Sequence, residues 1–219
     1  TVAGILNGTT NYILSRMDAE GLDFDEVLAD AQRLGYAEAD PSADVDGFDA
    51  ASKVAILSSI AFHTRITTDD VYQEGIRNLS AADIAEAKSL GYVVKLLGIA
   101  RNTPEGVDVR VHPTMIPANH MLAGVSGAMN AVYVVGDAVG ETMFYGAGAG
   151  SFPTASAVVG DVLALADAIS HNEQVQAEIK PFERVLPIRS IDDLATRYYV
   201  RLVVKDEVGT LAPVVDAFS

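Results

Sequence analysis

The sequence predicts an α+β fold in which a mixed β-sheet carries helices on one face. Segments with apolar residues at helical spacing come first, within residues 9–91. Short segments rich in Val, Ile and Tyr follow in residues 92–148, separated by Gly, Pro and Asn, which is typical of strands. A regular alternation of strands and helices, as in a parallel sheet, is not present.

Four helices are expected before the strands. Residues 9–18 follow a Gly-Thr-Thr-Asn opening, in which Thr and Asn are good caps. Asp23 is expected to cap the next helix, whose apolar stripe ends at Gly35. A third helix is expected from about residue 47 to residue 63, and a fourth over residues 80–91.

The rest of the chain divides into strands, one helix and a tail. Four strands are expected within residues 93–101, 107–116, 130–140 and 141–148. A helix follows over residues 152–170, with Pro153 suited to its first turn. We therefore expect one domain over residues 1–172, a linker over 173–196, and a strand, a turn and a helix within 197–219.

Composition narrows the class of protein. The 219 residues are 49% hydrophobic, which suffices for a packed core, and the net charge of −15 repels nucleic-acid phosphates. We expect no nucleic-acid partner, and no membrane partner, because a basic face is missing and no apolar run reaches the length of a membrane span. The absence of cysteine excludes disulfides and thiolate metal sites and fits a reducing compartment, here the cytoplasm. No signal peptide is expected, and a start at Thr1 rather than Met suggests a chain that begins inside a longer protein.

The stretch GYAEADPSADVDGFDAASKV places five carboxylates ahead of one lysine. On a helix, Asp46, Asp49 and Lys53 would share one face, and the Lys53 stem would cross apolar surface. A partly buried lysine keeps its charge beside carboxylates and can exchange a proton with a reacting oxygen. The alternative is a surface Asp–Lys pair worth about 0.3–0.5 kcal/mol.

The acidic loop around Glu38, Asp40 and Asp44 has three interpretations. It is a solvated loop that caps a helix, a calcium loop, or a pocket for a small cation such as the α-ammonium of an amino acid. The calcium interpretation is weak, because aligning Gly47 with the loop glycine places Lys53 where a bidentate Glu is needed.

The glycines Gly146, Gly148 and Gly150 precede the helix that begins near Phe152. Alternate glycines let a backbone approach a ligand, and a helix N-terminus favours anions. The motif is not G-x-G-x-x-G, and a tight strand-to-helix turn explains it equally well. The four histidines are scattered without metal-ligand spacing, so no metal site is expected.

Taken together, these residues resemble homoserine dehydrogenase. The resemblance covers most of residues 4–172, in the order of that family. Its segments are GILNGTTNYIL (4–14), LGYAEADPSADVDGFDAASKVAIL (34–57), VRVHPTMIPANHMLAGVSGAMNAVYVVGDAVGETMFYGAGAG (109–150) and FPTASAVVGDVLALA (152–166).

The resemblance implies an activity and roles for single residues. The family interconverts L-aspartate 4-semialdehyde and L-homoserine with NADP or NAD, a step toward threonine, isoleucine and methionine. By resemblance, Lys53 is the proton donor or acceptor and Asp49 a carboxylate that holds it. The residues implied to bind substrate are Glu38, Asp44, Thr9 and Gly8, and those implied to approach the cofactor are Gly146, Gly148 and Gly150.

The resemblance also implies a homodimer, with the interface mostly in residues 92–145, and a truncated regulatory module. The N-terminal dinucleotide-binding domain of the family has no counterpart in these residues. Residues 197–219 resemble the first strand and helix of an ACT domain, which senses amino acids, so feedback by threonine is a hypothesis. We expect this chain alone to be inactive. A hypothesis from another class is a dimerisation scaffold without a ligand, in which Lys53 matters only for stability.

Overall fold

The structure is a computed structural model of the chain, and it describes residues 1–171, 182 and 184–218. In the described part, six strands form one sheet in the order β2-β4-β3-β1-β5-β6. All neighbours are antiparallel except β2 and β4, so the mixed sheet is confirmed. The strands are β1 (Val2–Ile5), β2 (Tyr72–Gln73), β3 (Tyr92–Thr103), β4 (Gly106–Pro117), β5 (Asn130–Gly136) and β6 (Gly140–Gly146).

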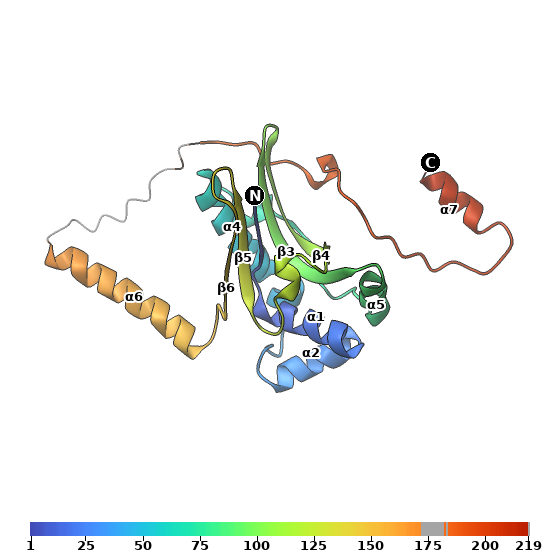
Figure 1. Cartoon of the computed structure of the whole chain (residues 1–219), viewed down its shortest axis with the longest axis horizontal. Helices are drawn as coiled ribbons and strands as arrows, with labels where there is room; N and C mark the ends of the chain where they lie inside the picture. Colours follow the sequence, from blue (N-terminus) through green and yellow to red (C-terminus); the bar gives the residue numbers. More distant parts are fainter. Residues whose placement is uncertain (172–181, 183, 219) are drawn as a thin grey trace.

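The expected helices of the first 91 residues are present, with a short extra turn in the acidic loop. Helices α1, α4 and α5 pack on the central strands, and α2 packs on α1 (Figure 1). The α-helices of the described chain are α1 (Gly8–Glu20), α2 (Phe24–Arg33), α3 (Ser42–Val45), α4 (Phe48–Phe62), α5 (Ala81–Ser89), α6 (Ser151–Ser170) and α7 (Leu211–Ala217).

The main core lies between the sheet and these helices. Leu14 from α1, Val54 from α4 and Val111 from β4 are almost completely buried there. A second cluster covers the other face of the central strands, where Leu122 and Val125 pack on Ile99. The helical layer on one face is therefore confirmed, and loop residues cover the opposite face.

Helix ends largely follow their local sequence, but the N-cap of α1 is Asn7, and the expected Gly-Thr-Thr-Asn opening, residues 8–11, lies inside the helix. Gly21 takes a left-handed conformation (φ 71°) and ends α1, and Gly47 (φ 89°) sets the start of α4 at Phe48. Asp23 occupies the N-cap position of α2, as expected, but its side chain makes no capping hydrogen bond there. Its carboxylate instead accepts a hydrogen bond from the backbone N–H of Ala81, at the start of α5.

Strand β1 was not expected from the sequence. Its four residues are too few for a strand pattern, and they form a strand because β3 and β5 flank them on both sides. This central place matters for the site, because β1 leads directly into α1.

The C-terminal tail differs from its expected form. Residues 173–181 and 183 of the expected linker lie outside the described residues. Residues 184–201, here called the strap, run along the sheet, where Arg184 pairs with Thr64 and Ile188 pairs with Val107. The strand expected within residues 197–219 is absent from the described tail, because no neighbouring strand pairs with it, whereas the turn and helix α7 are present. The expected ACT-like segment is therefore not confirmed by the described residues.

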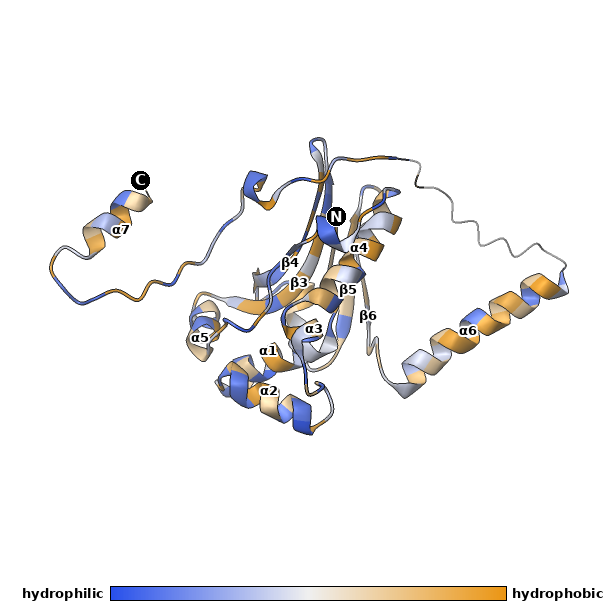
Figure 2. Cartoon of the chain, turned by 180° about the vertical axis from the view of Figure 1, so that it is seen from behind, coloured by the Kyte–Doolittle hydropathy of each residue, from blue (hydrophilic) through white to orange (hydrophobic). Residues whose placement is uncertain are grey.

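Helix α6 stands apart from the sheet, and none of its residues is buried (Figure 2). Within the described residues it is the one helix long and apolar enough, by length and composition alone, to cross a membrane. The expectation that no apolar run reaches this length was therefore wrong. Two carboxylates, Asp161 and Asp167, lie within the run.

Candidate active site

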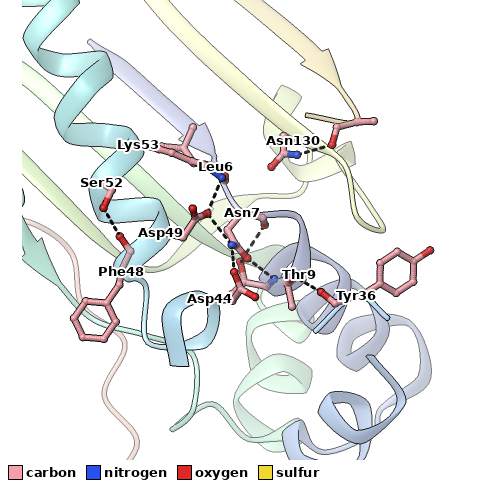
Figure 3. A network of polar contacts seen from close by, with 12 residues as sticks. Leu6, Asn7, Thr9, Tyr36, Asp44, Phe48, Asp49, Ser52, Lys53 and Asn130 are labelled. Carbon is pink, nitrogen blue, oxygen red and sulfur yellow. Dashed lines mark hydrogen bonds and ion pairs between the residues drawn. The ribbon is translucent and has the colours of Figure 1, made fainter. Parts of the chain in front are cut away.

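The junction between β1 and α1 is the centre of a polar network (Figure 3). Asn7 caps α1, since its Oδ1 accepts a hydrogen bond from the Thr10 N–H at 2.9 Å. Its Nδ2 donates to Asp44 Oδ1 at 2.6 Å and to Asp49 Oδ2 at 2.9 Å. One neutral side chain therefore joins two carboxylates from different helices, α3 and α4.

Lys53 is held at the same junction. Its Nζ donates to Asp49 Oδ2 at 2.6 Å and to the carbonyl oxygen of Leu6 at 3.1 Å. The side chain remains 49% exposed, so the ammonium group has fixed partners on the protein side and remains open to solvent. The expected pairing of Asp49 with Lys53 one helical turn later is present in α4.

Asp46 does not belong to this network, which corrects the expectation of three residues on one face. Gly47 in its left-handed conformation separates Asp46 from α4, so helical spacing does not apply to it. Its carboxylate forms an ion pair with Arg77, which also donates to Ser42 Oγ at 3.0 Å.

The acidic loop serves more than one purpose. Asp40 accepts hydrogen bonds from the hydroxyl and backbone N–H of Ser42, which lower the pKa of the Asp40 carboxyl. These bonds to Ser42, the first residue of α3, explain Asp40, although the N-cap position of that helix is Pro41. Glu38 is exposed, and Gln32 binds its carbonyl oxygen at 2.9 Å. The calcium interpretation loses two ligands, because Asp44 binds Asn7 and Asp46 binds Arg77.

Thr9 and Gly8 line the same junction. The Thr9 hydroxyl donates to the carbonyl oxygen of Tyr36 at 2.7 Å, which ties the acidic loop to α1. Gly8 lies against the loop at Ala128, where a Cβ atom would approach the Ala128 carbonyl oxygen to 2.7 Å. The structure thus brings Gly8, Thr9, Asp44, Asp49 and Lys53 to one junction, where hydrogen bonds link Asp44, Asp49 and Lys53 through Asn7.

A buried lysine holds the loop that covers Gly8. Lys95 is 2% exposed, and its Nζ donates to Asn11 Oδ1 at 3.0 Å and to the Val125 carbonyl at 2.6 Å. Asn11 also donates to the carbonyl oxygens of Val125 and Met129. Burial lowers the pKa of Lys95 to about 8, and the Asp18 carboxylate acts weakly in the opposite direction.

The glycine turn connects β6 to α6. Gly148 and Gly150 have positive φ angles of 70° and 113°, and Gly146 is the last residue of β6. A Cβ atom on Gly148 would lie 2.3 Å from Asn130 Nδ2, which donates to the Ala147 carbonyl at 2.8 Å. The turn interpretation therefore explains Gly148 and Gly150 by their backbone conformation. Asn130 Oδ1 is buried and has no hydrogen-bond partner within the described residues, so it could accept a bond from a bound group.

Sequence reasoning missed Asn7 as a site residue. The available signal was its position in Leu-Asn-Gly-Thr-Thr before a helix, and helix capping accounts fully for such a pattern. The contribution of the Leu6 carbonyl had no sequence signal, because every residue has a carbonyl group.

Comparisons with known proteins agree on one family. The family model described as homoserine dehydrogenase matches residues 1–163. The homoserine dehydrogenase of Corynebacterium glutamicum is 51% identical over 224 aligned residues, covering 100% of this chain and 50% of that protein. The chain thus spans about half the length of the curated relatives that it matches.

Solved structures give the same result. A homoserine dehydrogenase from Thiobacillus denitrificans matches with a TM-score of 0.76 at 55% identity, covering 78% of this chain and 40% of that one. A hyperthermophilic archaeal homoserine dehydrogenase mutant in complex with NADPH matches with a TM-score of 0.61 at 28% identity, covering 74% and 46%. Because the family model matches residues 1–163 and curated relatives match along the whole of this chain, the chain belongs to the homoserine dehydrogenase family.

Proposed function

We propose that this chain supplies the substrate-binding and catalytic residues of an enzyme that interconverts L-homoserine and L-aspartate 4-semialdehyde. The family supports the reaction class. The observation that carries the proposal is Lys53, whose ammonium group is fixed by Asp49 and the Leu6 carbonyl while its other side is open. A scaffold would not require a lysine held in this way at the edge of a carboxylate pair.

The carboxylates bind the substrate ammonium group in this proposal. Glu38 is exposed on the acidic loop, and Asp44 is fixed by Asn7, so both offer oxygen acceptors to a cation. Gly8 and Thr9 line the substrate at the start of α1, where the backbone lies close to the loop at Ala128. Two carboxylates also explain selectivity for an amino acid over an uncharged alcohol.

Lys53 exchanges the proton of the reacting oxygen. In the oxidation of homoserine, the neutral amine of Lys53 accepts the hydroxyl proton as the hydride leaves the carbon atom that bears this hydroxyl group. In the reverse direction, the ammonium group donates a proton to the aldehyde oxygen as the hydride arrives. Asp49 orients the Lys53 side chain through its hydrogen bond to Nζ.

NADP or NAD, when bound, accepts or supplies the hydride. Gly146, Gly148 and Gly150 and the free acceptor of Asn130 fit a turn that a cofactor approaches. The archaeal relative in complex with NADPH supports a nicotinamide nucleotide without deciding between the two. Because the chain spans about half the length of its curated relatives, we propose that the 219 residues alone are inactive.

The assembly and regulation of the enzyme are further parts of the proposal. A cytoplasmic homodimer that associates through residues 92–145 is proposed by family resemblance, and sedimentation of the full-length protein as a monomer would exclude it. Regulation by threonine through the ACT-like tail, residues 197–219, is a hypothesis that unchanged activity in saturating threonine would remove.

Replacement of Lys53 by alanine in the full-length protein tests the proposal. We expect kcat for L-homoserine oxidation to fall by about 10²- to 10⁴-fold, because the proton acceptor is lost, with little change in folding. Steady-state kinetics and circular dichroism provide the measurement.

Lys88→Ala is the matched control, since Lys88 is an exposed lysine that donates to the Asp18 carbonyl on another part of the surface. It should retain full activity. The 219-residue chain, assayed in parallel, should show no turnover. Full activity in Lys53→Ala would contradict the catalytic role and favour the scaffold hypothesis.

A further inference from the structure

We propose that Asn7 is a positioning residue of the active site, whose amide group holds Asp44 and Asp49 together and fixes Lys53 through Asp49. The inference rests on the proposed function, because it concerns how Lys53 is held in place. Three features of Asn7 support it: the orientation of its amide, its neutral charge, and its place next to Leu6 (Figure 3).

The orientation of the Asn7 amide is determined by its neighbours. Its Oδ1 accepts from the Thr10 N–H at 2.9 Å and lies 3.0 Å from the Thr10 hydroxyl. The nitrogen must therefore face the carboxylates, since a flipped amide would place its oxygen against two acceptors. Asn7 is 5% exposed, and both of its N–H groups are used, one for each carboxylate.

The neutral charge of Asn7 suits a site for a cationic substrate. Asp44 and Asp49 come from separate helices and would repel each other as carboxylates. A lysine or arginine between them would remove the repulsion, but it would also compete with the substrate ammonium group. An amide compensates the two carboxylates with hydrogen bonds, so that Asp44 keeps its negative charge for the substrate and Asp49 keeps its ion pair with Lys53.

The two hydrogen bonds of Lys53 Nζ to described residues both depend on the segment that contains Asn7. Asp49 Oδ2 accepts from Asn7 Nδ2 and from Lys53 Nζ, so the same oxygen connects the two side chains. The other contact of Lys53 is the carbonyl oxygen of Leu6, the residue before Asn7. Loss of the Asn7 amide would therefore free the Asp49 side chain, and Lys53 would no longer be held in its preferred position.

Two substitutions separate this role from helix capping. Asn7→Ser and Asn7→Asp both keep a side-chain acceptor for the N-terminus of α1, because Ser and Asp are good caps. Serine lacks the two N–H groups that reach the carboxylates, and aspartate adds a third carboxylate to the pair. In the full-length protein, we expect kcat for L-homoserine oxidation to fall roughly 10- to 100-fold, with a higher KM and a larger loss in Asn7→Asp.

The rise in KM distinguishes positioning from a structural role, since a smaller folded fraction lowers the apparent kcat but leaves KM unchanged. Ser80→Ala is the structural control. It removes the cap of α5, where Ser80 accepts from the Asp83 N–H, and it should lower the melting temperature with unchanged kinetics.

A double-mutant cycle with Asp49→Asn completes the test. If Asn7 acts through Asp49, the free-energy loss in kcat/KM of the combined variant is much smaller than the sum of the losses of the two single variants. Additive losses, or unchanged kinetics in Asn7→Ser while Lys53→Ala is inactive, would overturn this inference and leave the proposed function in place. Full activity in Lys53→Ala would instead overturn the proposed function and this inference with it.

Discussion

A Cβ atom on Gly8 would lie 2.7 Å from the carbonyl oxygen of Ala128, closer than real Cβ atoms come to backbone. Its φ angle is not positive, so the requirement for glycine comes from space and not from backbone conformation. The neighbouring residues Asn7 and Thr9 use their side chains for the network described above. At the scale of residues, the start of α1 therefore combines one position without room for a side chain with two polar residues whose side chains form hydrogen bonds.

Gly8→Ala should destabilise the chain by roughly 1–3 kcal/mol, because the added methyl group forces the loop at Ala128 away from α1. Urea unfolding monitored by circular dichroism measures the change. Gly124→Ala is the matched control, since a Cβ atom there meets nothing within 4 Å and its φ angle is not positive. Equal stability of the two variants would mean that the loop at Ala128 moves away from α1 without lowering the free energy of unfolding.

At the scale of elements, Lys95 connects β3, α1 and the loop over residues 125–129 inside the protein. Its ammonium group has an amide oxygen and a carbonyl oxygen as partners, and neither carries a full charge. Burial therefore lowers its pKa to about 8. The charged form costs stability that a neutral amine in the same place would not.

The contribution of Lys95 to stability should rise with pH between about 8 and 10.5. In this window the unfolded chain binds the Lys95 proton and the folded chain does not, so stability increases with pH. Below pH 8 the cost of burying the charge is fully present. The unfolding free energy, compared with that of Lys95→Met, should gain about 3 kcal/mol across the window. An identical pH dependence in both proteins would contradict the lowered pKa.

At the scale of the whole molecule, the strap connects three distant parts of the chain. Leu186 donates to Thr64 after α4, and the N–H of Arg189 donates to the Val107 carbonyl on β4 at 2.8 Å. Arg201 forms a bidentate ion pair with Asp83 at the start of α5, in which its Nε lies 2.6 Å from Oδ1. Burial alone would raise the pKa of Asp83, but hydrogen bonds from Ser80 and Arg201 outweigh it and lower the pKa.

Arg201→Ala should loosen the strap without unfolding α5, because Asp83 keeps its hydrogen bonds with Ser80. We expect amide hydrogen exchange over residues 184–201 to become a few-fold faster, as measured by mass spectrometry. Arg197→Ala is the control from the same strap, since Arg197 has no ion pair or hydrogen bond with the described residues. The same acceleration in both variants would show that the Asp83 contact is not specific.

Much of the fold could be predicted from sequence patterns, and the exceptions have physical reasons. The helix that contains Lys53 is continuous from Phe48 to Phe62, so helical spacing correctly paired Asp49 with Lys53. Asp46 was misplaced because Gly47 turns the backbone between them. Strand β1 was missed because its partners, β3 and β5, lie more than 80 residues away in the chain.

The sequence by itself determined the α+β class, the helices of the first 91 residues, the family and the pairing of Asp49 with Lys53. These depend on local periodicity, capping and motif spacing, which neighbouring residues encode directly. Only the tertiary structure decided that Asn7 joins Asp44 to Asp49, that the Leu6 carbonyl binds Lys53, and that the strap reaches Asp83. Each of these contacts joins residues 37 or more positions apart, so it depends on how the elements pack and not on their own patterns.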